Sequence, residues 1–464
     1  RDRGTAGPPR LPPAPQAPHP LGDLLSAPRK VSIAILSWNG KKHLENCLPA
    51  VLAQKDPGMD WEVLVLDNGS TDGTQGWMRE QYGSDRRVRF LESPVNLGFC
   101  AGNNRLVSEA DGDAVILLNN DTRPKPDWLA ALVDAYASAP PDVAAVSGQI
   151  IDWEGTRLDF ARGVMTFDGH AFQLDFRRPL DQVEIPKRGE ELLFACGGNM
   201  IIRRASYLAA GGFDESYFAY LEDVDLGWRL WSGGERVIFA PDAVVHHRSS
   251  ATSDLLGNFN RGFLFERNAF LTAYKNYESG LWERLMPVVM LTLLHRTQCL
   301  LLWNNPGTTT LQLDPYAGHI ANTGPTAPPL PPPLPLTPGN ILAKWKEFGP
   351  QQFWKRGLAK LRRTFLPPPP PAAPETPQLT DPRTIAQFRA ITNLLGNLDR
   401  AAECREAIQK RRKRPDREIF ERFPLYVVPT YPGDEILFAR EGWEGWWPEG
   451  VPVVRKSLDE VMDT

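Results

Sequence analysis

The sequence has few cysteines and no marked excess of either charge. Only 5 of its 464 residues are cysteine, widely scattered and without a Cys-x-x-Cys pair. An odd, scattered set of this kind is typical of reduced thiols in a cytosolic protein rather than of a disulfide framework. The formal net charge of −4 shows no basic excess, so the composition does not favour a nucleic-acid partner.

Long apolar runs are also lacking. The first thirty residues are rich in proline and contain no apolar segment of the kind that defines a secretory signal. In the most apolar stretch, residues 281–303, the uncharged part covers only 285–294. A helix needs ~20 apolar residues to span a bilayer. We therefore expect a buried or interfacial helix there, and not a transmembrane one.

Proline, by contrast, is abundant. The 44 prolines are about twice the usual share of ~5%, and they cluster in segments typical of disorder or linkers. At ~150 residues per domain, the length allows two or three units. The predicted parts are a Pro-rich disordered tail (1–29), an α/β domain (30–255), a helical segment packed on the core or membrane surface (256–322), a Pro-rich linker (323–340) and a C-terminal helical extension with a Trp-rich tail (341–464).

Between residues 30 and 255, apolar strand patterns alternate with helical ones. Strands are predicted at 31–36, 62–66, 88–91, 114–118, 143–147 and 236–239, and helices around 74–81, 103–110, 127–138 and 223–231. Such alternation favours a mixed, mostly parallel sheet covered by helices on both faces. Asn39 is placed to cap the helix that follows it, and Pro49 predicts a kink or early end of that helix.

Beyond the α/β domain the pattern is mainly helical. Residues 258–303 have helical spacing, 341–363 fit a basic amphipathic helix, and 382–413 fit one helix or a helical hairpin. Basic and aromatic residues at 258–300 and 344–363 suit an anionic membrane surface. The alternative is that these helices pack on the α/β domain.

Polar residues stand where two of the predicted strands end. Asp67 follows one apolar run, and Asn119-Asn120-Asp121 follows another. In an open α/β sheet, ligands bind at the carboxyl ends of strands. Oxygen ligands gathered there suit Mg²⁺ or Mn²⁺ and a diphosphate, and a carboxylate at Asp67 suits the imide N–H of uracil or thymine. The alternative is that both segments are ordinary turn-rich connections.

Two further pairs of residues are candidates for catalysis or metal binding. Glu222-Asp223 opens a predicted helix, where one carboxylate could take the proton of an attacking hydroxyl. Because successive helical residues point about 100° apart, we expect only one of them to face the reacting centre. The alternative is a favourable interaction of first-turn acids with the helix dipole. His246-His247 follows Pro241, and one of these histidines is a candidate metal ligand.

A glycine-containing loop leads into one of the predicted helices. Residues 96–104 offer backbone N–H groups that could contact phosphate oxygens. The loop lacks both the G-x-G-x-x-G pattern and the P-loop lysine, which argues against an NAD or ATP site.

With these residues assembled, the region 31–250 resembles family 2 glycosyltransferases of the GT-A fold, most closely the bacterial rhamnosyltransferase-like branch that builds cell-surface polysaccharides. The matching stretches lie at 37–40, 67–73, 96–104, 118–121, 211–215, 220–229 and 241–247. The resemblance implies an inverting, metal-dependent transfer of a sugar, rhamnose-like or hexose, from a UDP- or dTDP-linked donor. The implied acceptor is a hydroxyl of a glycan or lipid-linked oligosaccharide, with protein as the rival.

The resemblance also implies roles for individual residues. Asp67 would hold the base, Asn119 and Asp121 the metal and diphosphate, and Asp223 the acceptor proton. His247 would bind Mn²⁺ or Mg²⁺, because the family's ligand is the sixth residue after the proline. Glu222 is the second candidate base. The implied nucleotide site contains Ser37, Asn39, Asp67, Asn96, Gly98, Asn104, Asn119 and Asn120. The implied location is the cytoplasm, with peripheral contact at the inner face of the membrane.

Two other functions remain as alternatives. A sugar nucleotidyltransferase also uses a metal and acids at strand ends, but it should carry a Gly-rich basic loop near its first strand. Residues 37–40 lack that arginine pattern. A catalytically inactive GT-A-like binding module is the second alternative, against which the joint presence of Asp67, Asp121, Asp223 and His247 argues.

Overall fold

The computed structural model describes residues 28–248, 258–305, 379–431 and 433–463. The chain forms two compact units. Of the described residues, 28–248, 258–289, 389–428 and 444–463 belong to one unit, and 290–305, 379–388, 429–431 and 433–443 belong to the other. The predicted linker at 323–340, the basic helix at 341–363 and most of the tail at 1–29 lie outside the described residues.

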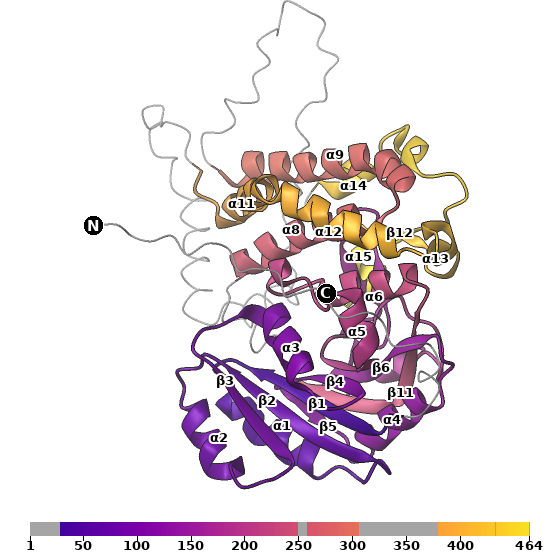
Figure 1. Ribbon diagram of the computed structural model, residues 1–464. Helices are drawn as coiled ribbons and strands as arrows, with labels where there is room; N and C mark the ends of the chain where they lie inside the picture. The colour runs from indigo at the N-terminus through magenta and orange to yellow at the C-terminus, as the bar shows by residue number, and fades with distance from the viewer. Residues whose placement is uncertain (1–27, 249–257, 306–378, 432, 464) are drawn as a thin grey trace, which may run out of the picture. The chain divides into compact units, whose positions relative to one another are not determined.

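The first unit is built on one large mixed sheet (Figure 1). Its strands are β1 (Lys30–Ser37), β2 (Asp60–Asn68), β3 (Val88–Ser93), β4 (Ala114–Asn119), β5 (Thr122–Pro124), β6 (Val143–Asp152), β7 (Leu158–Phe160), β10 (Asn199–Arg203) and β11 (Arg236–His247). The order is β3-β2-β1-β4-β10-β6-β11-β5, with β7 paired to β6. Strands β3, β2, β1 and β4 are parallel, as are β6 and β11, whereas β10 is antiparallel to both of its neighbours.

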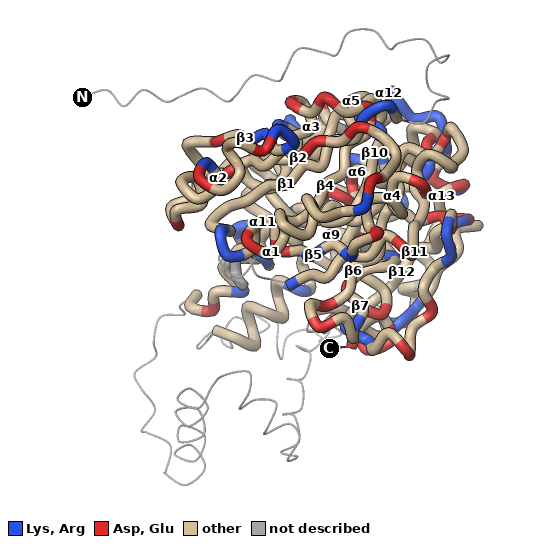
Figure 2. The backbone as a smooth tube through the Cα atoms, turned by 90° about the horizontal axis from the view of Figure 1, so that it is seen from below, with Lys and Arg blue, Asp and Glu red and all other residues tan. Residues whose placement is uncertain are grey.

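Helices pack on this sheet as the alternating pattern predicted. They are α1 (Lys41–Leu52), α2 (Thr74–Tyr82), α3 (Gly98–Glu109), α4 (Trp128–Ala137), α5 (Arg204–Ala210) and α6 (Glu222–Ser232). Most residues of the central strands β1 and β4 are apolar and most are buried, and Figure 2 shows these strands nearly free of charged positions. The prediction of a mixed, mostly parallel α/β sheet with flanking helices is confirmed.

Three local predictions for this domain were wrong. Asn39 does not cap α1, whose N-cap is Gly40 without a side-chain bond, because the Asn39 side chain bonds to the loop at 67–73 instead. Helix α3 begins at Gly98 rather than near 103. The last strand does not stop near 239, because β6 continues beside it and pairs with it as far as His247.

The region between β6 and β10 is compact and carries short strands. It contains β7, β8 (Gly163–Met165), β9 (Ala171–Gln173) and the 3-10 helix η2 (Leu180–Gln182). Strands β8 and β9 form a hairpin. The C-terminal segment contacts this region through bridges from Thr166 to Tyr426 and from Phe176 to Met462. The Trp-rich tail, for which the sequence predicted no structure, therefore supports the region next to the sheet.

The remaining elements are mostly helices. They are α8 (Asn258–Asn276), α9 (Ser279–Asn304), α11 (Pro382–Gly396), α12 (Leu398–Arg411), α13 (Asp416–Arg422), α14 (Asp434–Phe438) and α15 (Leu458–Val461), with η5 (Trp443–Trp446) and the strand pair β12 (Leu425–Val427) and β13 (Val453–Arg455). The residues at 382–413, predicted as one helix or a helical hairpin, contain the two helices α11 and α12. Within the second unit, Arg296 forms a buried ion pair with Asp434 at 2.9 Å.

Helix α9 is longer than its uncharged stretch suggested. It has 26 residues and by length and composition it could cross a membrane, but 56% of its apolar window is buried in the protein. On α8, Lys275 and Arg267 are buried, and they bond to Asp214 and to the carbonyl oxygen of Ser216. For these two basic residues the structure favours packing over a membrane surface.

Candidate active site

The strand register brings the predicted polar residues to one edge of the sheet. Ser37 at the end of β1 lies opposite Asp67 at the end of β2, and Leu36 lies opposite Asn119 at the end of β4. Because these strands are parallel, their carboxyl ends share an edge, where an α/β sheet binds ligands.

Asp67 is fully buried, yet only one of its two carboxylate oxygens accepts hydrogen bonds from the described residues. Its Oδ2 accepts from the backbone N–H of Ser70 at 3.2 Å and from Nε2 of Gln75 at 2.8 Å. Its Oδ1 has no hydrogen-bond partner among the described residues. A buried carboxylate oxygen without a partner is costly. The Oδ1 atom is therefore available to an N–H donor of a ligand.

Asn39 shapes the loop that contains Asp67. It adopts a positive φ of 49°, its backbone N–H donates to Ser70 Oγ at 2.8 Å, and its Oδ1 accepts from the backbone N–H of Thr71 at 2.8 Å. These bonds hold the loop at 67–73 beside the start of α1. The structure thus places Asn39 at the predicted nucleotide site but uses its side-chain oxygen internally.

The loop before α3 is closed by a similar internal bond. Oδ1 of Asn96 accepts from Nδ2 of Asn68 at 2.9 Å and from the backbone N–H of Gly98 at 2.8 Å. Gly98 has φ 85°, and a Cβ there would lie 2.5 Å from the ring of Phe218. Glycine is required both for the backbone conformation and for this close approach.

Asn104 lies farther along α3 and is engaged by the protein. Its Oδ1 accepts from the hydroxyl of Tyr207 at 2.6 Å and from the backbone N–H of Phe213 at 2.9 Å. Its Nδ2 donates to the carbonyl of Phe213 at 2.9 Å. These contacts tie α3 to the loop after α5. They give Asn104 a structural role, and its nucleotide contact stays a prediction.

Asn119 and Asn120 line the end of β4. Nδ2 of Asn120 donates to Ser37 Oγ at 2.9 Å, so the predicted residues Ser37 and Asn120 contact each other directly. The backbone N–H of Asn119 donates to the carbonyl of Gly198 at 3.2 Å. A Cβ on Gly198 would lie 2.8 Å from Nδ2 of Asn119, so the glycine leaves the room that this amide occupies.

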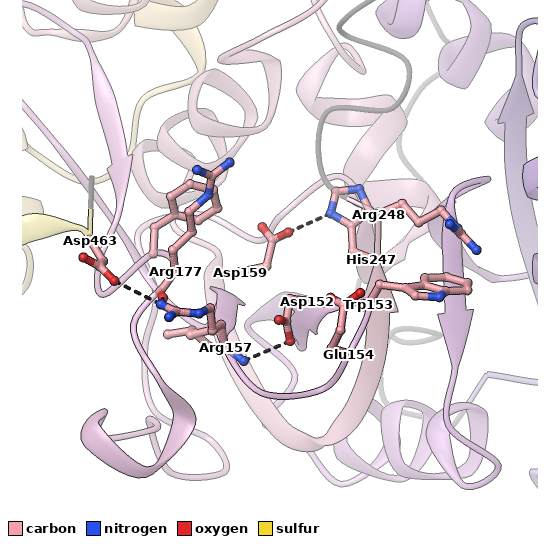
Figure 3. A pocket seen from close by; sticks show the side chains of 11 residues that line it. Asp152, Trp153, Glu154, Arg157, Asp159, Arg177, His247, Arg248 and Asp463 are labelled. Carbon is pink, nitrogen blue, oxygen red and sulfur yellow. Dashed lines mark hydrogen bonds and ion pairs between the residues drawn. The ribbon is translucent and has the colours of Figure 1, made fainter. Parts of the chain in front are cut away.

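His247 lies between two carboxylates, those of Asp121 and Asp159, and Figure 3 shows its contact with Asp159. Nε2 of His247 is 3.1 Å from Oδ1 of Asp121, and its Nδ1 is 2.8 Å from Oδ2 of Asp159. Burial opposes a charge on the imidazole, but the two carboxylates outweigh it and raise the pKa of His247 to about 10. Burial likewise opposes ionisation of Asp121, but the charge of His247 lowers the pKa of that carboxyl.

The two histidines point to different partners. Nδ1 of His246 is 3.1 Å from the carbonyl oxygen of Trp153, whereas His247 contacts the two aspartates. Both belong to β11, and successive strand residues face opposite sides of a sheet. The structure therefore brings His247 and not His246 to Asp121.

Asp159 was missed by the sequence reasoning. It lies on β7, inside a region that showed no readable pattern, and it is only 5% exposed. An acid between Leu158 and Phe160, both buried, was the single signal available. Its contact with His247 depends on the pairing of β7 with β6.

The donor set fits a divalent cation whose coordination a substrate completes. An imidazole and a carboxylate face each other at Asp121 and His247, and Asp159 on the other ring nitrogen is the arrangement that commonly orients a metal-binding histidine. Within the described ranges, no group of three or more His, Cys, Asp or Glu side chains is placed to hold a metal. Diphosphate and water oxygens would have to supply the remaining ligands, as is usual for Mg²⁺.

Glu222 and Asp223 begin α6 and have different surroundings. Oδ2 of Asp223 accepts from the backbone N–H of Gly197 at 3.2 Å. Glu222 is 7% exposed, and its Oε2 has no partner among the described residues. Burial raises the pKa of both carboxyls, and the charge of Asp223 raises that of Glu222 further. A raised pKa makes a carboxylate a stronger base.

A strained turn positions these two acids. Phe218, Tyr220 and Leu221 have positive φ angles of 64°, 72° and 65°, which non-glycine residues rarely adopt. The buried side chain of Asn268 on α8 donates to the carbonyls of Tyr217, Ala219 and Tyr220 at 3.2, 2.8 and 2.8 Å. These bonds stabilise a conformation that would otherwise be unfavourable.

The acid pair and the histidine cluster belong to one region. Asp223 accepts from the backbone N–H of Gly197 at 3.2 Å. The next residue, Gly198, accepts from the backbone N–H of Asn119, which stands two residues before Asp121. A cavity of about 560 Å³ opens beside Asp159 and His247. Its lining residues are Asp152, Trp153, Glu154, Arg157, Leu158, Asp159, Phe176, Arg177, His247, Arg248 and Asp463.

Comparison with known proteins identifies the family. The family Glycosyl transferase family 2 matches residues 32–209. The chain is 34% identical over 242 residues to the N-acetylglucosaminyl-diphospho-decaprenol L-rhamnosyltransferase of Mycobacterium tuberculosis. The alignment covers 47% of this chain and 76% of that protein. It is 31% identical over 232 residues to the O-antigen biosynthesis protein RfbC of Myxococcus xanthus, covering 48% of this chain and 18% of that protein.

Among solved structures, the mannosyltransferase PcManGT from Pyrobaculum calidifontis aligns with a TM-score of 0.41 and 16% identity. The alignment covers 80% of this chain and 88% of that one. The family is established by the sequence relatives. The predicted resemblance and the predicted enzyme class are both confirmed, and the chain belongs to glycosyl transferase family 2, as a rhamnosyltransferase-like glycosyltransferase.

Proposed function

We propose that the enzyme transfers a rhamnose-like sugar or a hexose, with inversion, from a UDP- or dTDP-linked donor to a hydroxyl of a lipid-linked oligosaccharide or glycan. The observation that carries the proposal is the placement of Asp67, the Asp121–His247 pair and Asp223 around one edge of the sheet. The Mycobacterium tuberculosis relative is by name a rhamnosyltransferase acting on a diphospho-decaprenol-linked sugar, which supports this acceptor class and a role in polysaccharide synthesis.

The donor would be bound at its base and at its diphosphate. The free Oδ1 of Asp67 accepts the imide N–H of the base. Asp121 and His247 would hold Mn²⁺ or Mg²⁺, which when bound neutralises the charge that develops on the departing nucleoside diphosphate. Asp159 keeps the His247 ring oriented so that Nε2 faces Asp121.

Asp223 would accept the proton of the attacking hydroxyl. In a single displacement the acceptor oxygen bonds to the anomeric carbon while the bond to the diphosphate oxygen breaks on the opposite side. The hydroxyl proton passes to Asp223, whose burial raises its pKa and strengthens it as a base. The backbone N–H of Gly197 fixes one carboxylate oxygen, so the geometry of the base is set before substrate binds. Glu222 is the second candidate.

We place the enzyme in the cytoplasm, where it would meet a lipid-linked acceptor at the inner face of the membrane. Exposed apolar side chains on α9, namely Met286, Leu291 and Leu294, support a peripheral contact.

A donor panel tests the proposal. UDP- and dTDP-linked sugars are incubated with Mn²⁺ and a short-chain lipid-linked acceptor, nucleotide release is measured, and the anomeric configuration of the product is read by NMR. We expect one donor class to react and the configuration to invert. Retention of configuration would exclude the single displacement. Pyrophosphate release from a nucleoside triphosphate and a sugar phosphate would instead identify a nucleotidyltransferase.

A further inference from the structure

The cavity beside His247 has no part in the reaction proposed above. It is formed by the β6–β7 turn, residues 176–177, the end of β11 and Asp463. Asp159 and His247 line it, whereas Asp121 does not. The cavity therefore lies on the Nδ1 side of the His247 ring, and the proposed metal position lies on the Nε2 side. The volume of about 560 Å³ is in the usual range for pockets that hold a ligand.

Three guanidinium groups line this cavity. Arg157 is paired with Asp463 at 3.0 Å, but Arg177 and Arg248 have no carboxylate partner in the part of the chain that the structure describes. In Figure 3, Asp159 and His247 lie between these two arginines. Their planar N–H forks are thus left for a ligand.

Aromatic rings support both unpaired arginines. The guanidinium carbon of Arg248 lies 3.9 Å from the ring centroid of Trp153, and that of Arg177 lies 5.2 Å from the ring of Phe176. Stacking on an aromatic face restricts a guanidinium while its in-plane N–H donors stay free.

The acids of the cavity are largely engaged. Asp152 accepts from the backbone N–H groups of Thr156 and Arg157 at 2.6 and 2.9 Å, and Asp159 is bound to His247. Among the acidic residues of the lining, Glu154 has no ion pair with an arginine or lysine of the described residues. An anionic group that contacts both Arg177 and Arg248 would therefore meet two donors of fixed orientation.

Phosphate is the anion that this arrangement fits. A guanidinium fork matches two phosphate oxygens at once, and a diphosphate offers oxygens on two phosphorus atoms. In the proposed reaction, a diphosphate could come from the donor or from a lipid-linked acceptor. The donor diphosphate already has a place at Asp121 and His247, on the other side of the imidazole.

We propose that Arg177 and Arg248 bind the diphosphate of a lipid-linked acceptor in this cavity and so direct the acceptor hydroxyl toward the proposed base. The inference rests on the proposed function, because it assumes a transferase acting on such an acceptor. It assigns the acceptor's charged group to named residues, which the reaction chemistry alone does not.

Binding of two matched probes tests the inference. Octyl-diphospho-N-acetylglucosamine and octyl N-acetylglucosaminide differ only in the diphosphate, and both are titrated calorimetrically into the full chain with saturating UDP or dTDP and Mn²⁺. We expect the diphosphate probe to bind at least about tenfold more tightly. Arg177→Ala and Arg248→Ala should each weaken its binding roughly tenfold and leave binding of the plain glycoside unchanged.

Control variants separate charge from fork geometry and from general effects. Arg86→Ala removes an exposed arginine outside the cavity and should change neither affinity. Arg177→Lys and Arg248→Lys keep the charge without the fork, and should recover part of the binding. Circular dichroism melting checks that each variant is folded.

Equal affinity for both probes, or no binding of the diphosphate probe, would overturn the inference. So would a loss of UDP or dTDP affinity in the two alanine variants, since the arginines would then serve the donor. Failure of the proposed function is distinguishable. In that case the diphosphate probe would bind as described, but no donor would transfer a sugar to it.

Discussion

At the scale of single residues, the polar side chains of the site divide into two kinds. Asp67 and Glu222 are buried and keep one carboxylate oxygen without a partner among the described residues. Asn39 and Asn104 use their side-chain oxygens to hold protein loops. The first kind is suited to act on a ligand, and the second sets the shape of the loops around it.

Replacing Asp67 with alanine should raise the donor KM more than it lowers kcat. Loss of a charged hydrogen bond costs ~1.5–3 kcal/mol, or roughly tenfold to a hundredfold in affinity. A contact to the base is far from the bond that breaks, so it should be similar in ground and transition states. Steady-state kinetics with varied donor measures both constants. Asp72→Ala, in the same loop, is the control. A collapse of kcat at constant KM would place Asp67 near the reacting centre.

Replacing Asp223 with asparagine should keep donor binding and abolish most transfer. The amide cannot accept the hydroxyl proton, and loss of a general base typically costs ~10²–10⁴ in rate. Transfer rates and calorimetric nucleotide binding are compared with those of Glu222→Gln. A greater loss in Glu222→Gln than in Asp223→Asn would reassign the base to Glu222.

Replacing Asp159 with asparagine should weaken Mn²⁺-dependent nucleotide binding about tenfold to a hundredfold, because the residue orients the His247 ring. Asp121→Ala and His247→Ala should weaken it as well, while His246→Ala should have little effect, since His246 contacts the Trp153 carbonyl. Calorimetry with and without Mn²⁺ decides the matter. The assignment is wrong if His246→Ala does more damage than His247→Ala.

At the scale of elements, helix α8 determines where α6 begins. Its Asn268 holds the turn before Glu222. Its fully buried Lys275 pairs with Asp214 at 2.6 Å and with Asp225 at 3.1 Å. Asp225 in turn pairs with Arg229 of the same helix at 2.7 Å. A helix outside the matched family region thus supports the start of the helix that carries the proposed base.

Removing the Asn268 side chain should affect both stability and catalysis. Asn268→Ala leaves buried carbonyls unsatisfied, which costs ~1–3 kcal/mol in the free energy of unfolding, and it releases the strained turn next to Asp223. We expect a lower denaturation midpoint and a lower kcat with little change in donor KM. Asn46→Ala, an exposed asparagine bonded only within α1, serves as the control. An unchanged kcat would show that the turn does not position Asp223.

At the scale of the whole molecule, a second carboxylate–histidine cluster stabilises the region that packs beside the sheet. Buried His170 lies 3.1 Å from Asp168 and 2.9 Å from Glu266, which joins the β8–β9 hairpin to α8. Burial opposes a charge on this imidazole, but the two carboxylates raise its pKa to about 9.

This raised pKa predicts a pH-dependent stability. The protonated form is favoured in the folded state, so the contribution is complete below the ordinary pKa of 6.5 and is lost as pH rises through about 9. We expect His170→Gln to reduce the unfolding free energy at pH 6 by ~1–3 kcal/mol, and by less at pH 9.5. Urea denaturation of both proteins at the two pH values measures the difference. An equal loss at both values would show that the charge of His170 does not stabilise the fold.

The sequence by itself determined most of the longer strands and helices of the α/β domain and the residues at the ends of its first strands. Apolar runs such as 31–36 and 114–118 are almost entirely buried, and the period of the pattern distinguishes strand from helix without long-range information. The turn residues after them are equally local signals. For this reason Asp67, Asn119 and Asp121 could be assigned to one edge before the fold was known.

Only the tertiary structure decided which side chains meet. Asp159 reaches His247 because β7 folds back on β6, and Asn268 reaches the turn at 217–221 from a different helix. Asn39 likewise bonds across to Thr71 instead of capping α1. Each contact joins residues that are distant along the chain, so no local pattern encodes it. Pairing of strands and packing of helices bring these residues together, because burial of the apolar faces fixes which polar groups lie beside one another.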